Sequence, residues 1–126
     1  MDQCWSLFLT TGWNTEYQIT AEQLAGAVAR SWYTVSAYDA DQFVGFGRVV
    51  GDEILHGMIY DVIVHPAYQR QGIGGRILDR LVQRCLEAHI RDIQLFCSHG
   101  NQTFCEKRGF RVRPRDAPGM EYVATK

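Results

Sequence analysis

A long amphipathic stretch between two short apolar runs constrains the fold of this chain more than any other feature. Met58–Val64 and Ile93–Cys97 are apolar runs typical of buried strands. Between them, apolar residues recur at helical spacing and polar side chains fill the other positions; the apolar set is Ile73, Ile77, Leu78, Leu81, Val82, Cys85 and Leu86. A strand, a helix and a strand in this order predict a βαβ unit with parallel strands and a right-handed crossover.

The flanking segments predict further strands. Trp32–Tyr38 and Phe43–Val50 are rich in β-branched and aromatic residues, and Asp39–Gln42 between them is a turn, so the three predict a β-hairpin. Phe110–Arg113 and Met120–Ala124 are expected to close the sheet as an antiparallel pair. The expected fold class is therefore α/β, with a mixed and mostly antiparallel sheet around a central parallel βαβ unit.

Three shorter elements are also predicted. Thr20 stands at the N-cap of a short helix, with Gln23 three residues on, as in a capping box. Asn101–Arg108 is expected to form a second short helix that ends at Gly109. Cys4–Thr10 is apolar and is expected to form an edge strand.

Composition excludes several classes of protein. The chain has 126 residues, 46% hydrophobic and 21% charged, which is typical of one globular domain spanning residues 1–126. Its 13 basic and 14 acidic residues give a net charge of −1, so nucleic acid is not an expected partner. No apolar run approaches the roughly 18 residues of a membrane span, and the chain opens without a basic signal region. We therefore expect a cytoplasmic protein with no membrane partner.

Cysteine spacing gives no sign of a metal site. Cys4, Cys85, Cys97 and Cys105 lack the C-x-x-C pairing of zinc sites, and no second pair of ligands accompanies Cys97 and His99. No metal is expected, and free thiols without an export signal fit a reducing compartment.

The link into the long helix carries the chemical signal. It reads Gln69-Arg70-Gln71-Gly72-Ile73-Gly74-Gly75-Arg76, without an acidic residue. A helix N-terminus exposes unpaired N–H groups, and glycines let a phosphate approach them. The glycines could instead simply fit a tight turn, and the spacing matches neither G-x-G-x-x-G nor the P-loop. The residues alone thus indicate a phosphate-bearing small molecule.

Three segments resemble the GNAT superfamily of N-acetyltransferases, over roughly residues 58–113. Gln69–Gly74 matches the signature Q/R-x-x-G-x-G/A, Asp61–Pro66 resembles the central strand of the family, and Asn101–Phe110 resembles N-x-x-F-Y-E-K-x-G-F. The resemblance implies that three segments contact one acetyl-CoA. The turn binds its pyrophosphate, the strand backbone pairs with its pantetheine arm, and the last segment supplies further contacts to the coenzyme. The implied binding residues are Val62, Ile63, Val64, Gln69, Arg70, Gln71, Gly72, Ile73, Gly74, Gly75, Arg76, Asn101 and Phe104.

The resemblance implies direct transfer of an acetyl group from acetyl-CoA to a primary amine in a ternary complex. A protonated amine must lose a proton before it attacks, and Asp61, a carboxylate in an apolar strand, is the first candidate base. Asp61 could equally be structural, with its carboxylate satisfied by neighbouring backbone groups or by Arg48. Glu53, His56 and His65 are alternative bases. Tyr60-Asp61 occupies the place of Glu-Asp in the similar glucosamine-6-phosphate N-acetyltransferases.

Cys105 is the point at which the sequence departs from the family, because the usual residue is tyrosine. The thiol could protonate the leaving thiolate, carry the acyl group itself, or only fill space. An alternative function is a catalytically silent acyl-CoA sensor, and a third is a nucleotide-binding module. The acceptor amine is not identified, and a homodimer paired through sheet edges is possible in such a family.

Overall fold

The computed structural model describes residues 2–124 of the chain. The chain divides into two compact units, Met1–Phe96 and Cys97–Lys126. The elements in order are α1 (Asp2–Leu9), α2 (Asn14–Tyr17), α3 (Ala21–Ala29), β1 (Tyr33–Asp39), β2 (Gln42–Gly51), β3 (His56–Val64), the 3₁₀ helix η1 (Pro66–Tyr68), α4 (Ile73–Glu87), β4 (Asp92–Leu95) and α5 (Gln102–Lys107).

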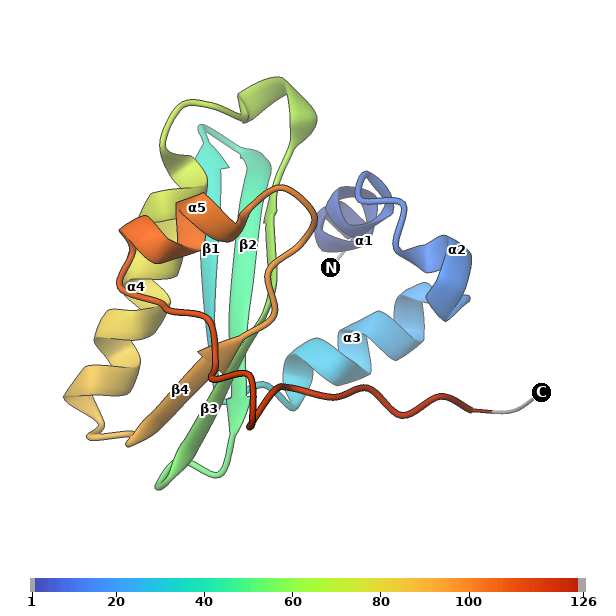
Figure 1. Cartoon of the computed structure of the whole chain (residues 1–126). Helices are drawn as coiled ribbons and strands as arrows, with labels where there is room; N and C mark the ends of the chain where they lie inside the picture. The colour runs from blue at the N-terminus through green and yellow to red at the C-terminus, as the bar shows by residue number, and fades with distance from the viewer. Residues whose placement is uncertain (1, 125–126) are drawn as a thin grey trace. The chain divides into compact units, whose positions relative to one another are not determined.

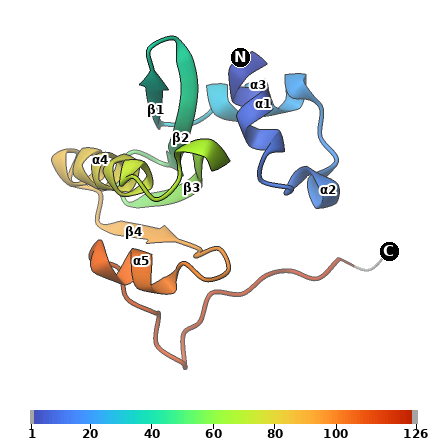
Figure 2. The same cartoon turned by 90° about the horizontal axis from the view of Figure 1, so that it is seen from above.

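The first unit is a four-stranded sheet in the order β1-β2-β3-β4, with helices on both faces. The first three strands pair antiparallel and β3 pairs parallel with β4, which confirms the predicted hairpin and the parallel βαβ unit. Helix α4 covers one face of the sheet, and α1 and α3 lie on the other (Figures 1 and 2). The α/β fold class with a mixed sheet is thus confirmed.

Two glycines on β2 let α4 approach the sheet closely. A Cβ on Gly45 would come within 2.8 Å of Ile77 Cδ1. A Cβ on Gly47 would come within 2.8 Å of both Ile77 Cγ2 and Leu81 Cδ1. The apolar stripe predicted for this helix is buried here, since Ile77, Leu78, Leu81 and Cys85 are at most 2% exposed. Because Gly45 and Gly47 carry no side chain, α4 can pack directly against this part of β2.

The expectation of an edge strand at Cys4–Thr10 is wrong, because this segment forms helix α1 instead. Leu7 and Phe8 are buried in a cluster with Leu24, Phe43, Phe46 and Ile63, and Cys4 and Trp5 pack against it. Positions 4, 5, 7 and 8 share one face of a helix, so a helix buries all four on one side. A short apolar run does not distinguish this arrangement from a strand.

The capping box at the start of α3 is confirmed. Thr20 Oγ1 accepts from Gln23 N–H at 3.1 Å, and Gln23 Oε1 accepts from Thr20 N–H at 2.9 Å. These two bonds satisfy backbone donors that the first turn of a helix leaves unpaired.

The second unit contains α5, which confirms the short helix predicted before Gly109. The antiparallel pair predicted at Phe110–Arg113 and Met120–Ala124 is wrong, since residues 110–124 contain no strand. Val112 is 65% exposed, and Met120, Tyr122 and Val123 are more than 80% exposed. Apolar side chains that find no surface to cover do not stabilise a strand, whatever their β propensity.

A β-bulge interrupts the pairing of β2 with β3. Phe46 is opposite Ile63 and Arg48 is opposite Tyr60, so Gly47 faces two residues, Asp61 and Val62. Asp61 has a φ of +58°, a left-handed conformation that is uncommon outside glycine. The bulge therefore falls on the candidate catalytic carboxylate.

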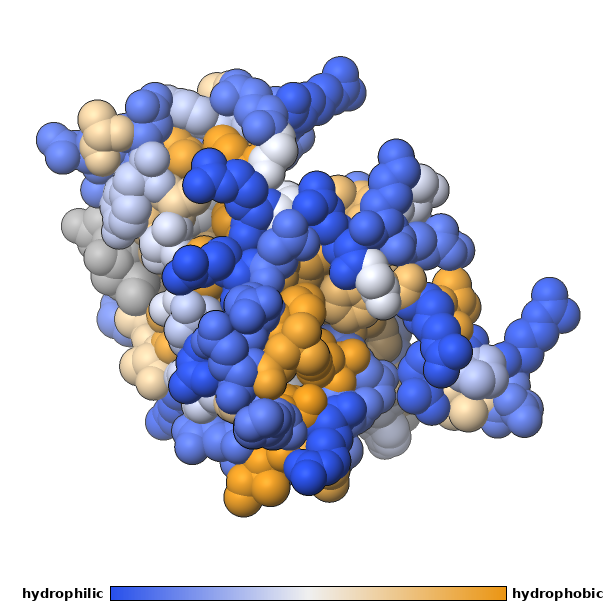
Figure 3. Space-filling view, turned by 90° about the vertical axis from the view of Figure 1, so that its left-hand side faces the viewer, coloured by the Kyte–Doolittle hydropathy of each residue, from blue (hydrophilic) through white to orange (hydrophobic). Residues whose placement is uncertain are grey.

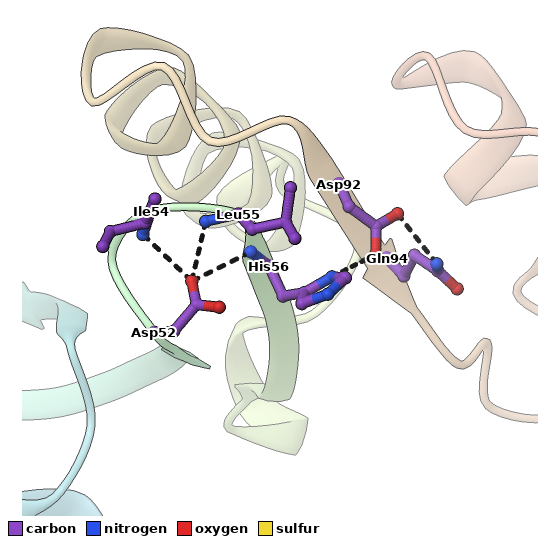
Figure 4. Close-up of polar contacts among 6 residues, drawn as sticks. All are labelled: Asp52, Ile54, Leu55, His56, Asp92 and Gln94. Carbon is purple, nitrogen blue, oxygen red and sulfur yellow. Dashed lines mark hydrogen bonds and ion pairs between the residues drawn. The ribbon is translucent and has the colours of Figure 1, made fainter.

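Polar contacts fix the start of β3 (Figure 4). Asp52 Oδ1 accepts from the backbone N–H groups of Ile54, Leu55 and His56 at 2.7–3.0 Å, and these bonds lower the pKa of Asp52 to about 2. His56 Nδ1 lies 2.7 Å from Asp92 Oδ2, which joins the first residue of β3 to the first residue of β4. The parallel pair thus begins in a defined register.

Candidate functional site

The C-terminal half of β3 has a free edge within the first unit. Strand β4 pairs only with His56–Ile59, and β3 continues to Val64. Beyond Ile59, the edge opposite β2 has no strand partner among residues 2–96. Val62, Ile63 and Val64, which the sequence assigned to the pantetheine arm, lie on this stretch. Their backbone groups can pair with an extended ligand.

The loop after β3 is held by side chains at both ends. His65 Nδ1 accepts from Ala67 N–H at 3.0 Å and caps η1. Tyr68 Oη donates to Asp39 Oδ2 at 2.7 Å, and this bond raises the pKa of Tyr68. Gln69 Nε2 donates to the carbonyl of Val64 at 3.0 Å. These contacts fix the approach of the chain to α4.

The first turn of α4 is uncapped. Gly72 occupies the N-cap position with a φ of +85°, and no side chain accepts from the turn. The first intrahelical bond runs from Arg76 N–H to Gly72 C=O at 3.1 Å, so the N–H groups of Ile73, Gly74 and Gly75 lack an intrahelical acceptor. A Cβ on Gly72 would meet nothing within 4 Å, which leaves the space beside the turn open.

The charge of this turn suits an anion. The first turn of α4 contains no acidic residue, and Arg70 and Arg76 on either side of Gly72 are both exposed. The helix dipole adds partial positive charge at the same place, so two cations are favourable here only when an anion is also bound. The structure thus brings together the eight turn residues assigned from the sequence and the end of β3.

Asp61 forms an ion pair. Its Oδ2 accepts from Arg48 Nε at 2.7 Å, and the two side chains are 18% and 16% exposed. Arg48 Nη1 also donates to the carbonyl of Ala27 and to Ser31 Oγ, each at 3.2 Å. This is the structural partnership that the sequence left open as an alternative to a catalytic base.

The other candidate bases either lie far from the turn or are already hydrogen-bonded. Glu53 and His56 are at the N-terminal end of β3, and His56 is paired with Asp92. His65 is at the C-terminal end but uses Nδ1 to cap η1. Ser31 and Ala27, which hold Arg48, have no sequence signal, because they lie 17 and 21 residues from it.

The remaining site residues predicted from the sequence, Asn101, Phe104 and Cys105, belong to the second unit. Asn101 Nδ2 donates to Ser98 Oγ at 2.5 Å, and the Arg108 guanidinium lies 5.7 Å from the centre of the Phe104 ring. Cys105 is 6% exposed; burial and a hydrogen bond with Cys97 raise its pKa to about 11. At neutral pH this thiol is protonated, which disfavours it as a nucleophile.

Residues 2–124 contain neither a cluster of metal ligands nor a membrane-spanning helix. No three His, Cys, Asp or Glu side chains of this range lie together as potential metal ligands. No helix of this range is long and apolar enough to cross a bilayer. In this α/β arrangement β3 leads through η1 into the uncapped, glycine-rich N-terminus of α4, which is suited to an anionic ligand.

Comparison with known proteins identifies the family. The model of the acetyltransferase (GNAT) family matches residues 1–110. The chain therefore belongs to the GNAT family.

Individual relatives agree with this assignment. The uncharacterized N-acetyltransferase ycf52 of Pyropia yezoensis is 34% identical over 79 residues, which are 63% of this chain and 45% of that protein. The chain thus spans less than half the length of this relative. A GNAT-family acetyltransferase of Streptococcus pneumoniae has a TM-score of 0.71 at 31% identity, with 85% of this chain and 82% of that one covered.

The glucosamine-6-phosphate branch is a more distant neighbour. The glucosamine-6-phosphate N-acetyltransferase of Arabidopsis thaliana has a TM-score of 0.56 at 21% identity, over 66% of this chain and 59% of that one. This likeness extends to the fold alone.

Proposed function

We propose that this protein is an acetyl-CoA-dependent N-acetyltransferase that transfers acetyl directly to a primary amine. The observation that carries the proposal is the uncapped N-terminus of α4, with its open space at Gly72, next to the free edge of β3. Coenzyme A contains a pyrophosphate and an extended pantetheine arm with two amides, and these two features of the structure suit them in that order. Family membership supports the same reading.

Each part of the site has a binding role in this proposal. The free N–H groups of residues 73–75 donate to the pyrophosphate oxygens, with Arg70 and Arg76 as counter-charges. Backbone groups of residues 62–64 hydrogen-bond the pantetheine amides. Gln69 and Gln71 flank the turn, and the resemblance to the family adds Asn101 and Phe104 as coenzyme-binding residues.

The chemistry requires three proton transfers. The protonated amine loses one proton, and its nitrogen then attacks the thioester carbonyl; as the C–S bond breaks, the nitrogen loses a second proton to solvent and the thiolate of coenzyme A takes one up. We assign the first transfer to Asp61 or to a group that it positions, and the protonation of the thiolate to the Cys105 thiol, which regains its proton from solvent. The raised pKa of Cys105 keeps this thiol protonated at neutral pH, and it also makes the thiol a weaker proton donor than an ordinary thiol.

A catalytically silent acyl-CoA sensor is the second candidate. The ion pair of Asp61 with Arg48 favours it, because this contact gives the carboxylate a structural role. The buried Cys105, in place of the tyrosine usual in the family, favours it too.

Two measurements separate the candidates. Calorimetry should show acetyl-CoA binding more tightly than ATP, which lacks the pantetheine arm; equal affinities would favour a general nucleotide module. Thiol release from acetyl-CoA should accelerate with some members of a panel of primary amines. Binding without any amine-dependent release would identify the sensor.

We also propose that the protein works in a compartment that keeps thiols reduced, with the cytoplasm as the expected one. Cys4, Cys85, Cys97 and Cys105 are all free, even though Cys97 and Cys105 are in hydrogen-bond contact. Microscopy of a fluorescent fusion tests the location.

A further inference from the structure

Cys97 and Cys105 form a contact pair of thiols within the second unit. Cys97 is exposed and precedes the turn into α5, whereas Cys105 is buried in the middle of α5. The two side chains are hydrogen-bonded to each other. The proposed transfer reaction uses only Cys105, so that function does not account for a second thiol beside it.

Local contacts bring the two sulfur atoms together. Asn101 N–H donates to the carbonyl of Ser98 at 3.1 Å, and Asn101 Nδ2 donates to Ser98 Oγ, so two bonds close the turn that follows Cys97. Cys105 N–H donates to the carbonyl of Asn101 at 3.1 Å, which places Cys105 one helical turn further on. The two thiols are thus held on either side of a short, closed turn.

This arrangement permits a disulfide. The S–S bond is about 2.05 Å long, so two thiols in hydrogen-bond contact need to approach by on the order of 2 Å. Cys97 lies in the irregular segment between β4 and α5, where neither a helix nor a strand fixes its backbone. The movement therefore falls on Cys97, and Cys105 can stay in its helix.

The other two cysteines lie on opposite faces of the sheet. Cys4 packs against the core cluster beneath α1, and the Sγ of Cys85 on α4 lies 3.4 Å from where a Cβ of Gly57 would be. Cys85 is fully buried on the α4 side of the molecule, whose surface shows hydrophilic side chains around an apolar strip (Figure 3). Because the sheet separates them, Cys4 and Cys85 cannot pair with each other.

We propose that Cys97 and Cys105 are a peroxide-sensitive dithiol that closes to an internal disulfide. Exposure makes Cys97 the sulfur that hydrogen peroxide reaches first, and contact makes Cys105 the sulfur that completes the reaction. The first step needs access for one small molecule at Cys97 and not an open surface. The raised pKa of Cys105 keeps its thiol protonated at neutral pH, which agrees with its second place.

The oxidation has two steps. The Cys97 thiolate attacks one oxygen of hydrogen peroxide; an S–O bond forms, the O–O bond breaks, and the leaving hydroxide takes up the proton that the thiol lost, which gives a sulfenic acid and water. The Cys105 sulfur then attacks the Cys97 sulfur; the S–S bond forms, the S–O bond breaks, and hydroxide leaves as water with the Cys105 proton. Two thiols are thus oxidised as one peroxide is reduced to two waters. A dithiol reductant reverses the change by thiol–disulfide exchange.

The disulfide has a consequence for acetyl transfer. It occupies the sulfur to which the proposed mechanism assigns protonation of the coenzyme A thiolate, and a disulfide sulfur carries no proton to donate. Oxidation should therefore slow transfer, and reduction should restore it. This consequence rests on the proposed function, whereas the oxidation itself does not.

The test treats the reduced full chain with hydrogen peroxide and maps the product by mass spectrometry without reduction. Trypsin cleaves after Arg91 and Lys107, so both cysteines fall in one peptide, 92–107, and dimedone traps any sulfenic acid. Cys97→Ser and Cys105→Ala each remove one sulfur of the pair. Cys4→Ser is the matched control, because it removes a thiol outside the pair.

We expect peptide 92–107 of the oxidised wild type to be lighter by two hydrogen atoms, and dithiothreitol to restore its mass. Cys4→Ser should behave like the wild type, Cys97→Ser should not show this loss, and Cys105→Ala should give a dimedone adduct at Cys97. An unchanged peptide in the wild type would overturn the proposal. So would a disulfide between two chains, or a Cys97 sulfenic acid that persists in the wild type.

The same samples test the consequence for transfer, once catalase has removed the peroxide. Acetylated amine should form at least about tenfold more slowly with the oxidised wild type, since a general acid typically contributes more than that, and reduction should restore the rate. Cys97→Ser should keep its rate after peroxide. A disulfide without any fall in rate would overturn the regulatory part of the inference. If the reduced chain acetylates no amine, the proposed function fails, and the mass of peptide 92–107 still decides whether the dithiol is oxidised.

Discussion

Arg48 Nε donates a 2.7 Å hydrogen bond to Asp61 Oδ2, so β2 holds the residue at which β3 bulges. The same guanidinium reaches Ala27 and Ser31 at the end of α3. One arginine thus joins two strands and a helix. Any proton that Asp61 accepts must be accepted beside this positive charge.

The Asp61→Asn variant tests whether the carboxylate takes part in catalysis. Asparagine keeps the shape of the side chain and an acceptor for Arg48 but removes its basicity, so we expect the rate of acetyl transfer to fall by roughly 10²–10⁴. Affinity for acetyl-CoA should change little, as calorimetry can show. Ser31→Ala is the control, because it removes a partner of Arg48 and leaves Asp61 intact. If Asp61→Asn keeps most of its activity, Asp61 is structural.

Gly74→Val tests the coenzyme turn. A branched side chain in the first turn of α4 would keep a phosphate from the backbone N–H groups, so affinity for acetyl-CoA should fall by well over tenfold. Gly26→Val, a glycine within α3 where a Cβ has 3.6 Å of clearance, controls for the cost of valine in a helix. Unchanged affinity in Gly74→Val would remove the turn from the binding site.

A pair of substitutions at Cys105 distinguishes a proton donor from a nucleophile. Cys105→Ala should slow transfer, and Cys105→Tyr, which restores the residue usual in the family, should keep or raise the rate. Intact mass should show no stable acetyl adduct on the wild type, because a thiol with a pKa of about 11 carries little thiolate at neutral pH. An acetyl adduct together with an inactive tyrosine variant would contradict direct transfer.

The Asp52 loop should make the stability of the first unit sensitive to acid. Three backbone N–H groups lower the pKa of Asp52 from 3.8 to about 2 in the folded chain. The ionised carboxylate therefore adds stability above about pH 4, and this contribution is lost as the pH falls toward 2. We expect Asp52→Asn to lose less stability than the wild type over that interval, as measured by denaturant unfolding. Asp41→Asn, in the β1–β2 turn, should follow the wild type.

Local signals in the sequence were enough for the elements that carry them. The stripe of Ile77, Leu78 and Leu81 predicted α4, and Thr20 with Gln23 predicted the start of α3. Segment Cys4–Thr10 was predicted wrongly, since its apolar residues fit a strand as well as a helix until the sheet face that they cover is known. The prediction of two C-terminal strands was wrong for a related reason. The β propensity of a segment does not ensure that another strand lies beside it to pair with.

The candidate site also has parts that the sequence predicts and parts that it does not. The turn from Gln69 to Arg76 could be predicted, because a helix N-terminus and its glycines are local features. The bulge at Asp61 could not, because it is a mismatch between β3 and a strand more than ten residues away along the chain. An open groove of about 620 Å³ between β1 and α4 also depends on long-range packing, since its two walls come from separate elements.

The bulge at Asp61 changes which residue numbers of β3 face α4. Before it the odd positions do, as Gly57 shows by its proximity to Cys85; after it the even ones do, as Val62 shows by its proximity to Gly47. Removing Asp61 altogether would therefore return the strand to strict alternation without turning any other side chain over. The hydrophobic core does not require the extra residue. What the extra residue supplies is a local bend in β3 and a carboxylate beside Arg48, between the paired start of the strand and the turn that leads into α4.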